Sequence, residues 1–156
     1  MARLKIECFD EKLNLRKLAK AVYSTLGQTD NLKAEIVFYS AEDMQKLNAE
    51  SRKVDKVTDV LSFPTLDGIR GKVVKSEDYP MENDGKYTVV GSIVLCNEKI
   101  KAQAEEYGHT EKDERDYLII HGLLHLFGYD HMEESDKKEM RALEKEILKK
   151  LGRKDD

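Results

Sequence analysis

Three histidines within the segment DYLIIHGLLHLFGYDH are the residues of this chain best suited to chemistry. His121 and His125 are four residues apart in a predicted helix, so their imidazoles stack on one helix face about 6 Å apart along the axis. Gly128 ends that helix and turns the chain back, because glycine adopts the left-handed conformation without steric cost. His131 follows three residues later and can fold over as a third ligand.

Three imidazoles at this spacing predict a site for one transition-metal ion. Zinc is favoured by its availability, although copper, nickel and iron also accept imidazole ligands. Three protein nitrogens leave a fourth position open, which is typical of catalytic rather than structural zinc, and zinc in such a site lowers the pKa of a bound water to about 7. A hydrogen-bonded core role is the usual alternative for one histidine on an apolar helix, and the spacing of all three argues against it.

The spacing His-x3-His-x2-Gly-x2-His also matches the zinc motif of a large group of metallopeptidases. In that group a glutamate directly after the first histidine serves as general base, and here this position is Gly122. Peptide hydrolysis by that route therefore lacks its proton acceptor. We expect Gly122 to serve close packing or to leave room for substrate. Asp130, next to His131, either orients an imidazole or is an ordinary turn aspartate.

The elements that must position these residues follow from hydrophobic periodicity. Strands are expected over 4–9, 34–40, 57–63 and 87–96, with Gly91 as a bulge in the last and Pro64 closing the third. Helices are expected over about 13–26, 41–52, 98–107, 111–127 and 135–151, with Ser40, Asn97 and Thr110 as N-caps. Together they predict one α+β domain over residues 1–156: a mixed sheet of about four strands packed by about five helices, with the metal site at the end of the central helix. Residues from about 152 to 156 are predicted to be a disordered tail.

The composition is that of a globular protein, with 40% hydrophobic and 37% charged residues. The first residues, MARLKIECFDEK, contain no signal-peptide-like apolar run, and no segment could span a bilayer, so we expect a cytoplasmic protein without membrane contact. Cys8 and Cys96 are expected to be buried reduced thiols. The net charge of −4 argues mildly against a general nucleic-acid coat, and a basic patch between Gln45 and Lys75 stays open.

Two long motifs, HGLLHLFGYDH over 121–131 and SRKVDKVTDVLSFP over 51–64, resemble those of the YbeY family of bacterial endoribonucleases. The resemblance extends from about Leu4 to Leu151. It implies a compact α+β metalloprotein with one Zn²⁺ held by His121, His125 and His131. It also implies a single-strand-specific endoribonuclease that acts in maturation of ribosomal RNA, notably at the 3′ end of the small-subunit RNA, and in ribosome quality control. Its expected partners are single-stranded and ribosomal RNA, the small ribosomal subunit and associated factors.

The family's arginine in the connection from helix to strand matches Arg52, which the resemblance implies is catalytic. A guanidinium suits this role, because its planar fork grips phosphate oxygens and stabilises charge in the transition state. Without the family, Arg52 reads as a surface arginine. Two departures stand out: Ser92 occupies a position where many members have aspartate, and the irregular stretch 65–86 is longer than in compact members. A loop of that length is either functional or mobile.

The leading hypothesis is therefore metal-dependent cleavage of single-stranded RNA, with Arg52 holding a phosphate and Lys53 or Lys56 assisting. The general base is left open, and attack by the ribose 2′-hydroxyl is the alternative. A metal-dependent peptidase or amidase is a second hypothesis, which needs a carboxylate from elsewhere in the chain. A non-catalytic ribosome-associated factor with a structural metal is the third. The oligomeric state is not predicted.

Overall fold

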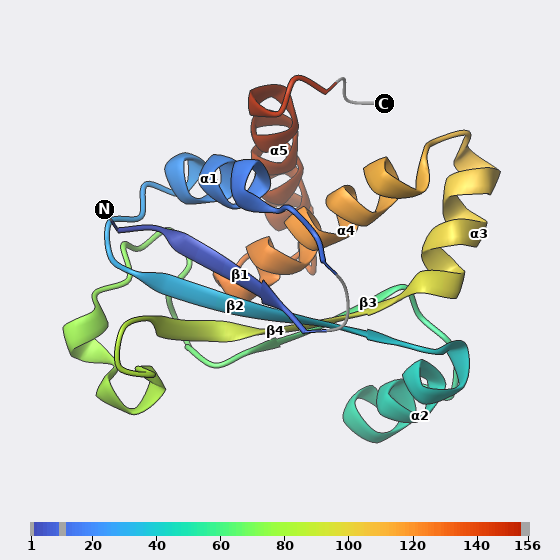
Figure 1. Ribbon diagram of the computed structural model, residues 1–156, viewed down its shortest axis with the longest axis horizontal. Helices are drawn as coiled ribbons and strands as arrows, with labels where there is room; N and C mark the ends of the chain where they lie inside the picture. The colour runs from blue at the N-terminus through green and yellow to red at the C-terminus, as the bar shows by residue number, and fades with distance from the viewer. Residues whose placement is uncertain (1, 10–11, 154–156) are drawn as a thin grey trace.

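The sheet and helices predicted from the sequence are present in the computed structural model, which describes residues 2–9 and 12–153 (Figure 1). The strands are β1 (Leu4–Cys8), β2 (Leu32–Tyr39), β3 (Val60–Pro64) and β4 (Thr88–Cys96). The helices are α1 (Arg16–Thr25), α2 (Ala41–Arg52), α3 (Asn97–Tyr107), α4 (Glu111–Leu126) and α5 (Glu134–Lys150), with short 3₁₀ turns η1 (Ser76–Asp78) and η2 (Pro80–Glu82). The predicted α+β class with one mixed four-stranded sheet is confirmed.

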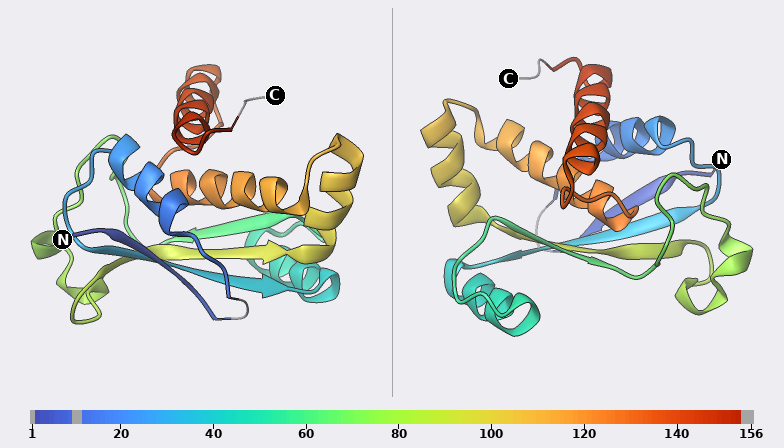
Figure 2. Two further views of the ribbon diagram at one scale, coloured as in Figure 1. Left: turned by 45° about the horizontal axis from the view of Figure 1, so that its top comes forward. Right: turned by 180° about the vertical axis from the view of Figure 1, so that it is seen from behind.

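The sheet has the strand order β1-β2-β4-β3. β1 and β4 both run parallel to β2, whereas β3 runs antiparallel to β4. Helices α1, α4 and α5 lie on one side of the sheet, and α2 lies on the other side at the end of β2 (Figure 2). The long helix α4 therefore lies between the sheet and α5, the position of a central helix.

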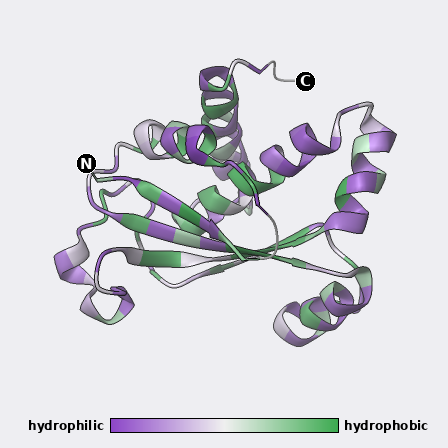
Figure 3. Ribbon diagram, in the orientation of Figure 1, coloured by the Kyte–Doolittle hydropathy of each residue, from purple (hydrophilic) through white to green (hydrophobic). Residues whose placement is uncertain are grey.

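Alternation along the strands divides the apolar side chains between two cores, and Figure 3 shows this alternation along β1 and β2. The larger core lies under α1, α4 and α5 and includes Ile36 and Ile93, which pair across β2 and β4. The smaller core lies beneath α2 and contains Met44, Leu61, Val94 and Cys96. Successive strand residues point to opposite faces, so each position in β3 and β4 belongs either to the α4 face or to the α2 face.

The sequence predicted that Pro64 would follow the third strand and end it. In the structure Pro64 is itself the last residue of β3. Cys96 donates its backbone N–H to Asp59 (3.0 Å), and Thr65 donates to Val90 (3.1 Å). Antiparallel ladders alternate, so the groups of 59, 61, 63 and 65 face β4 and those of Pro64 face outward. Because β3 is an edge strand, the N–H that proline lacks is not needed there.

Gly91 marks an irregularity in β4, as expected, although the strand is continuous. Lys33 pairs with Val89 and Ala34 with Gly91, so Val90 is the extra residue of a bulge. Gly91 has φ 149°, and a Cβ there would lie 2.5 Å from the Phe63 carbonyl oxygen and 2.6 Å from Leu126 Cδ2. The close approach of β3, β4 and α4 at this point requires glycine.

The helix caps, the cysteines and the C-terminal tail differ in part from the predictions. Ser40 and Thr110 cap α2 and α4 as predicted, but α3 begins at Asn97 itself, so Cys96 occupies the N-cap position. Cys96 is a buried free thiol, whereas Cys8 is only half-buried because β1 lies at the sheet edge. Of the predicted tail, 154–156 lie outside the described residues. None of the described helices combines the length and apolar character needed to cross a membrane.

Replacing Gly91 by alanine is expected to lower the free energy of unfolding by about 3 kcal/mol, because the new Cβ overlaps a carbonyl oxygen and a core leucine. Urea unfolding of the metal-free protein measures this change. The matched control is Gly27→Ala, where φ is 63° and no atom lies within 4 Å of the new Cβ, so only about 1 kcal/mol of backbone strain is expected. Equal losses in both variants would contradict the close-approach explanation.

Candidate metal centre

Helix α4 carries two of the three histidines and is held at both ends. The Thr110 hydroxyl accepts from the Asp113 backbone N–H (3.0 Å) at its start, and Gly128, with φ 94°, turns the chain after its last residue. At its middle α4 lies directly on the sheet, since a Cβ on Gly122 would lie 3.0 Å from Ile93 and 3.2 Å from Ser62 Oγ. Gly122 therefore serves close packing, which is one of the two roles expected for it.

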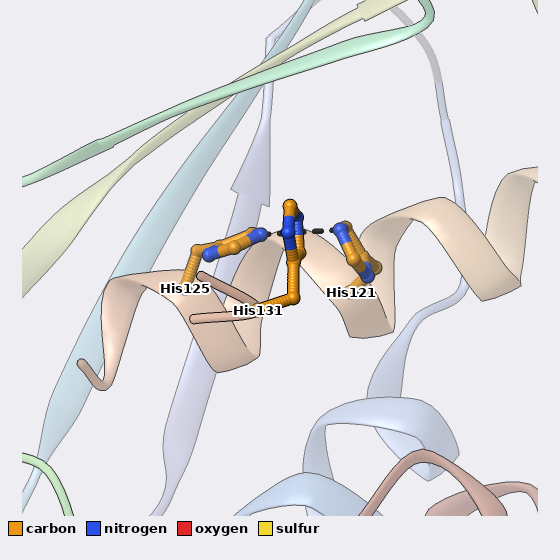
Figure 4. Close-up of side chains that lie close together, drawn as sticks. All are labelled: His121, His125 and His131. Carbon is orange, nitrogen blue, oxygen red and sulfur yellow. Dashed lines mark hydrogen bonds between the residues drawn. The ribbon is translucent and has the colours of Figure 1, made fainter. Parts of the chain in front are cut away.

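The three histidines come together as the sequence predicted. One nitrogen of each ring lies within 4.8 Å of the corresponding nitrogens of the other two, and Figure 4 shows the rings turned toward one another. The Nε2 atoms of His121 and His125 are 3.1 Å apart, and the His131 ring centre lies 5.6 Å and 5.2 Å from those of His121 and His125. His121 and His125 are half-buried, whereas His131 is exposed, so the site opens to solvent on one side.

Hydrogen bonds to the opposite ring nitrogens set the tautomers of two histidines. Nδ1 of His121 lies 2.8 Å from Glu144 Oε2, and Nδ1 of His125 lies 2.9 Å from the Tyr129 carbonyl oxygen. A carboxylate and a carbonyl only accept, so each Nδ1 carries the hydrogen and each Nε2 presents a lone pair. Two lone pairs 3.1 Å apart repel one another, and a cation bound between them removes that repulsion.

The donor set fits a zinc-sized ion. Zinc–nitrogen bonds of about 2.0–2.1 Å at a tetrahedral angle place two ligand nitrogens roughly 3.3 Å apart, close to the separation found here. Burial, with His121 and His131 nearby, lowers the pKa of His125 to about 4, so this imidazole is neutral and able to bind a metal near pH 7. The three imidazoles therefore form a pre-arranged nitrogen site with an exposed side.

Glu144 on α5 is a site residue that the sequence reading missed. Its side chain is buried at 3% exposure, and besides His121 it contacts the Tyr117 hydroxyl and the Arg141 guanidinium, each at 3.4 Å. Burial, followed by the nearby Glu144 carboxylate, raises the pKa of Tyr117 to about 12. The sequence held a signal, because Glu144 lies on the apolar stripe of α5 between Met140 and Ile147, where a carboxylate needs a buried partner.

The cluster itself contains no carboxylate among the described residues. Glu144 is engaged on the far nitrogen of His121, and Asp130 accepts from the Met132 backbone N–H (3.4 Å), a turn contact. Of the two roles left open for Asp130, this backbone contact supports the turn role. The peptidase alternative lacks the positioned general base that it requires.

Arg52 does not contact the three histidines. It is exposed on the last turn of α2, on the opposite side of the sheet from α4, and its side chain forms no ion pair or hydrogen bond with another described residue (Figures 1 and 2). Lys53 follows in the left-handed conformation at φ 60°, which ends the helix. The connection that carries them is held by buried Asn48, which donates to the Lys56 carbonyl (2.9 Å).

A polar bridge joins the end of this connection to α4. The Gln103 side-chain amide on α3 donates to Asp59 (3.2 Å) and to Glu114 (3.0 Å). Glu114 is buried and precedes His121 by two helical turns. The bridge therefore holds the connection after Arg52 and the histidine helix in a defined relation, although the two lie on different faces.

Ser92, the departure from the family pattern, is half-buried and lies on the α2 face of β4. It pairs with Glu35 and Phe63, whereas the next residue, Ile93, faces α4 and Gly122. Because neighbouring strand residues point to opposite faces, Ser92 lies on the face opposite the histidines. Its substitution for aspartate leaves the three-imidazole cluster unaltered.

Comparison with known proteins identifies a family. A family model described as "Endoribonuclease YbeY" matches residues 3–152. Among curated relatives, "Endoribonuclease YbeY" of Clostridium botulinum (strain Alaska E43 / Type E3) is 43% identical over 155 residues, covering 94% of this chain and 92% of the relative. The protein of the same name from Clostridium kluyveri (strain NBRC 12016) is 48% identical over 122 residues, covering 74% and 73%.

A solved structure shares the fold. The solution structure of TM1509 from Thermotoga maritima aligns over 96% of this chain and 91% of its own length, with a TM-score of 0.58 and 21% identity. At this identity the likeness concerns the fold alone. It supports the arrangement of a four-stranded sheet and covering helices described above.

Replacing Glu144 by glutamine is expected to weaken zinc binding about 10- to 100-fold, because a neutral amide holds the Nδ1 hydrogen of His121 less firmly and makes Nε2 less basic. Competition with a chromophoric chelator measures the dissociation constant. Glu146→Gln, an exposed position on the same helix, is the control and should bind zinc as the wild type does. Unchanged affinity in Glu144→Gln would show that this contact does not tune the site.

Proposed function

Because the chain belongs to the YbeY family of endoribonucleases, we propose that it is a zinc-dependent enzyme that cleaves single-stranded RNA at the site formed by His121, His125 and His131. The observation that carries the proposal is the convergence of three imidazole nitrogens within 4.8 Å on an exposed side of the molecule. Family membership supplies the class of reaction, and the nitrogen cluster supplies the place where it would occur.

The residues of the site divide the proposed work between them. His121 and His125 direct Nε2 lone pairs at one point, and Glu144 and the Tyr129 carbonyl hold the hydrogens on the opposite nitrogens. When bound, the ion supplies a Lewis acid that polarises a phosphate oxygen. The described residues place no carboxylate in the cluster to act as general base, so the nucleophile, water or the ribose 2′-hydroxyl, would lose its proton to another group.

Arg52 is proposed to bind a phosphate that flanks the cleaved one. Its exposure, its separation from the histidines and the neighbouring cations Lys53 and Lys56 support contact with an extended strand that passes from α2 to α4. Its guanidinium would hold phosphate oxygens through two parallel hydrogen bonds. Lys53 and Lys56, also exposed, would add electrostatic attraction that weakens with salt.

The proposed biological role is maturation of ribosomal RNA, at the 3′ end of the small-subunit RNA, together with ribosome quality control. Support comes from the two motifs that span 51–64 and 121–131, which contain Arg52 and the three histidines and resemble motifs of the family. The proposed partners are the small ribosomal subunit and its associated factors, and a role on ribosomal RNA implies action in the cytoplasm.

Purified protein is expected to contain about one zinc ion per chain, because the open three-nitrogen site matches zinc geometry. Elemental analysis of the wild type and of His125→Ala measures this content. The variant should contain little metal, since one of three ligands is lost. A wild type that carries another metal in stoichiometric amount would correct the identity of the ion, and equal zinc in both proteins would place the metal elsewhere.

Single-stranded RNA should be cleaved by the wild type, and cleavage should stop with a chelator or in His125→Ala. Arg52→Ala is expected to lower the rate about 100-fold, because the two hydrogen bonds that position the flanking phosphate are lost. Arg52→Lys should lie between them, since lysine keeps the charge without the fork. Gel analysis of a labelled RNA measures these rates.

Arg16→Ala, an exposed arginine on α1, is the matched control and should cleave at the wild-type rate. Equal cleavage by every preparation would indicate a contaminating nuclease and overturn the proposal. A folded, metal-loaded Arg52→Ala protein that sustains full function in cells would favour the non-catalytic, structural-metal alternative.

A further inference from the structure

The irregular segment 65–86 was expected to be functional or mobile, and the structure shows it anchored at several points. Leu66, Ile69 and Val74 are buried at 4%, 2% and 1% exposure. The buried Gln28 side chain donates to the Lys72 carbonyl (2.9 Å) and accepts from the Val74 N–H (2.8 Å). These contacts fix the middle of the segment against the turn after α1, so its path over the protein is determined.

Arg70, in the same segment, forms an ion-pair network with the start of α5. Its Nη1 lies 2.7 Å from Asp136 Oδ1, and its Nε and Nη2 both hydrogen-bond Glu139 Oε1. The side chains of Arg70 and Asp136 are 35% and 18% exposed. Because its nitrogens bind two carboxylates at once, the guanidinium is held in a more defined position than it would be in a single surface ion pair.

The same residues press on the turn that follows α4. The Arg70 guanidinium carbon lies 5.7 Å from the centre of the Tyr129 ring. Gly128 lies against the Arg70 backbone so closely that a Cβ there would be 2.9 Å from the Arg70 nitrogen. Arg70 therefore contacts both the beginning of the turn 128–131 and the first part of α5.

The turn 128–131 supplies the parts of the metal site that do not come from α4. The Tyr129 carbonyl holds Nδ1 of His125, and His131 is the one ligand that does not lie on α4. No described residue forms a hydrogen bond with the His131 ring, in contrast to the other two imidazoles. The position of His131 thus depends on the path of its backbone, which the contacts at Tyr129 and Gly128 determine.

We propose that Arg70 is a positioning residue of the metal site: by holding the turn 128–131 against α5, it fixes where His131 lies. Segment 65–86 then has a function, since it supports the third ligand from outside the histidine helix. The inference rests on the proposed metal site and not on RNA cleavage. It predicts that losing Arg70 weakens metal binding although Arg70 touches no ligand nitrogen.

Zinc affinity, measured by chelator competition, should fall at least about tenfold in Arg70→Ala, as for other outer contacts of metal sites. Co²⁺ added alone to the metal-free protein provides a second readout, because loss of one imidazole changes the d–d absorption spectrum of the bound ion. Arg70→Lys should recover part of the affinity, since lysine keeps a charge near Asp136 but cannot make both contacts. Asp136→Asn should weaken zinc binding in the same direction by removing one partner of Arg70.

Lys75→Ala is the matched control, because Lys75 lies in the same segment but contacts Thr29, away from the turn (3.3 Å). Its zinc affinity and cobalt spectrum should equal those of the wild type. Urea unfolding of each metal-free variant separates a lost fold from a displaced ligand, and Asp136→Asn replaces Arg70→Ala if the latter is unfolded. Wild-type affinity and spectrum in folded Arg70→Ala would overturn the inference alone, whereas a wild type that binds no zinc would overturn the metal site with it.

Discussion

The metal site depends first on two imidazole lone pairs, carried by the Nε2 atoms of His121 and His125, which lie 3.1 Å apart. Left alone, they repel, and rotation of either ring would relieve the repulsion. Rotation is opposed because the opposite nitrogens of His121 and His125 are tied to Glu144 and to the Tyr129 carbonyl. The fold therefore holds the two nitrogens in a position that is favourable chiefly with a cation between them.

Besides the sheet under α4, helix α5 and segment 65–86 support that arrangement. Glu144 reaches His121 from one side of α5, and Asp136, a little over two turns earlier, engages Arg70. The carboxylates of one helix thus serve the site in two ways, one through an imidazole and the other through the turn that carries His131. Glu144 is a buried charge that is stable only with its partners in place, so the histidine helix and α5 depend on one another at this point.

The packing of α4 on the sheet fits the presence of glycine where metallopeptidases with the same histidine spacing have a glutamate. Gly122, where peptidases have their catalytic glutamate, lies against the side chains of Ile93 and Ser62, so that even a Cβ there would press on both. The histidines lie to one side of that contact, on the exposed flank of the helix. A nitrogen cluster without a carboxylate among the described residues suits an anionic substrate, because a carboxylate there would repel a phosphate.

The sequence by itself determined the relations that act within one element. A four-residue interval places His121 and His125 on one face, Thr110 begins their helix and Gly128 ends it, all through local backbone geometry. Periodicity likewise predicted the strands and helices to within a few residues. Two boundaries were off by one residue, because Pro64 belongs to β3 and Asn97 belongs to α3 instead of capping it. Tertiary structure alone decided that Glu144, 23 residues from His121, reaches its imidazole. It also decided that Arg70 pairs with Glu139, 69 residues away, and so borders the site. Only the fold placed Arg52 on the other side of the sheet. These contacts join segments far apart in the chain, and no local pattern encodes which distant side chains packing will bring together.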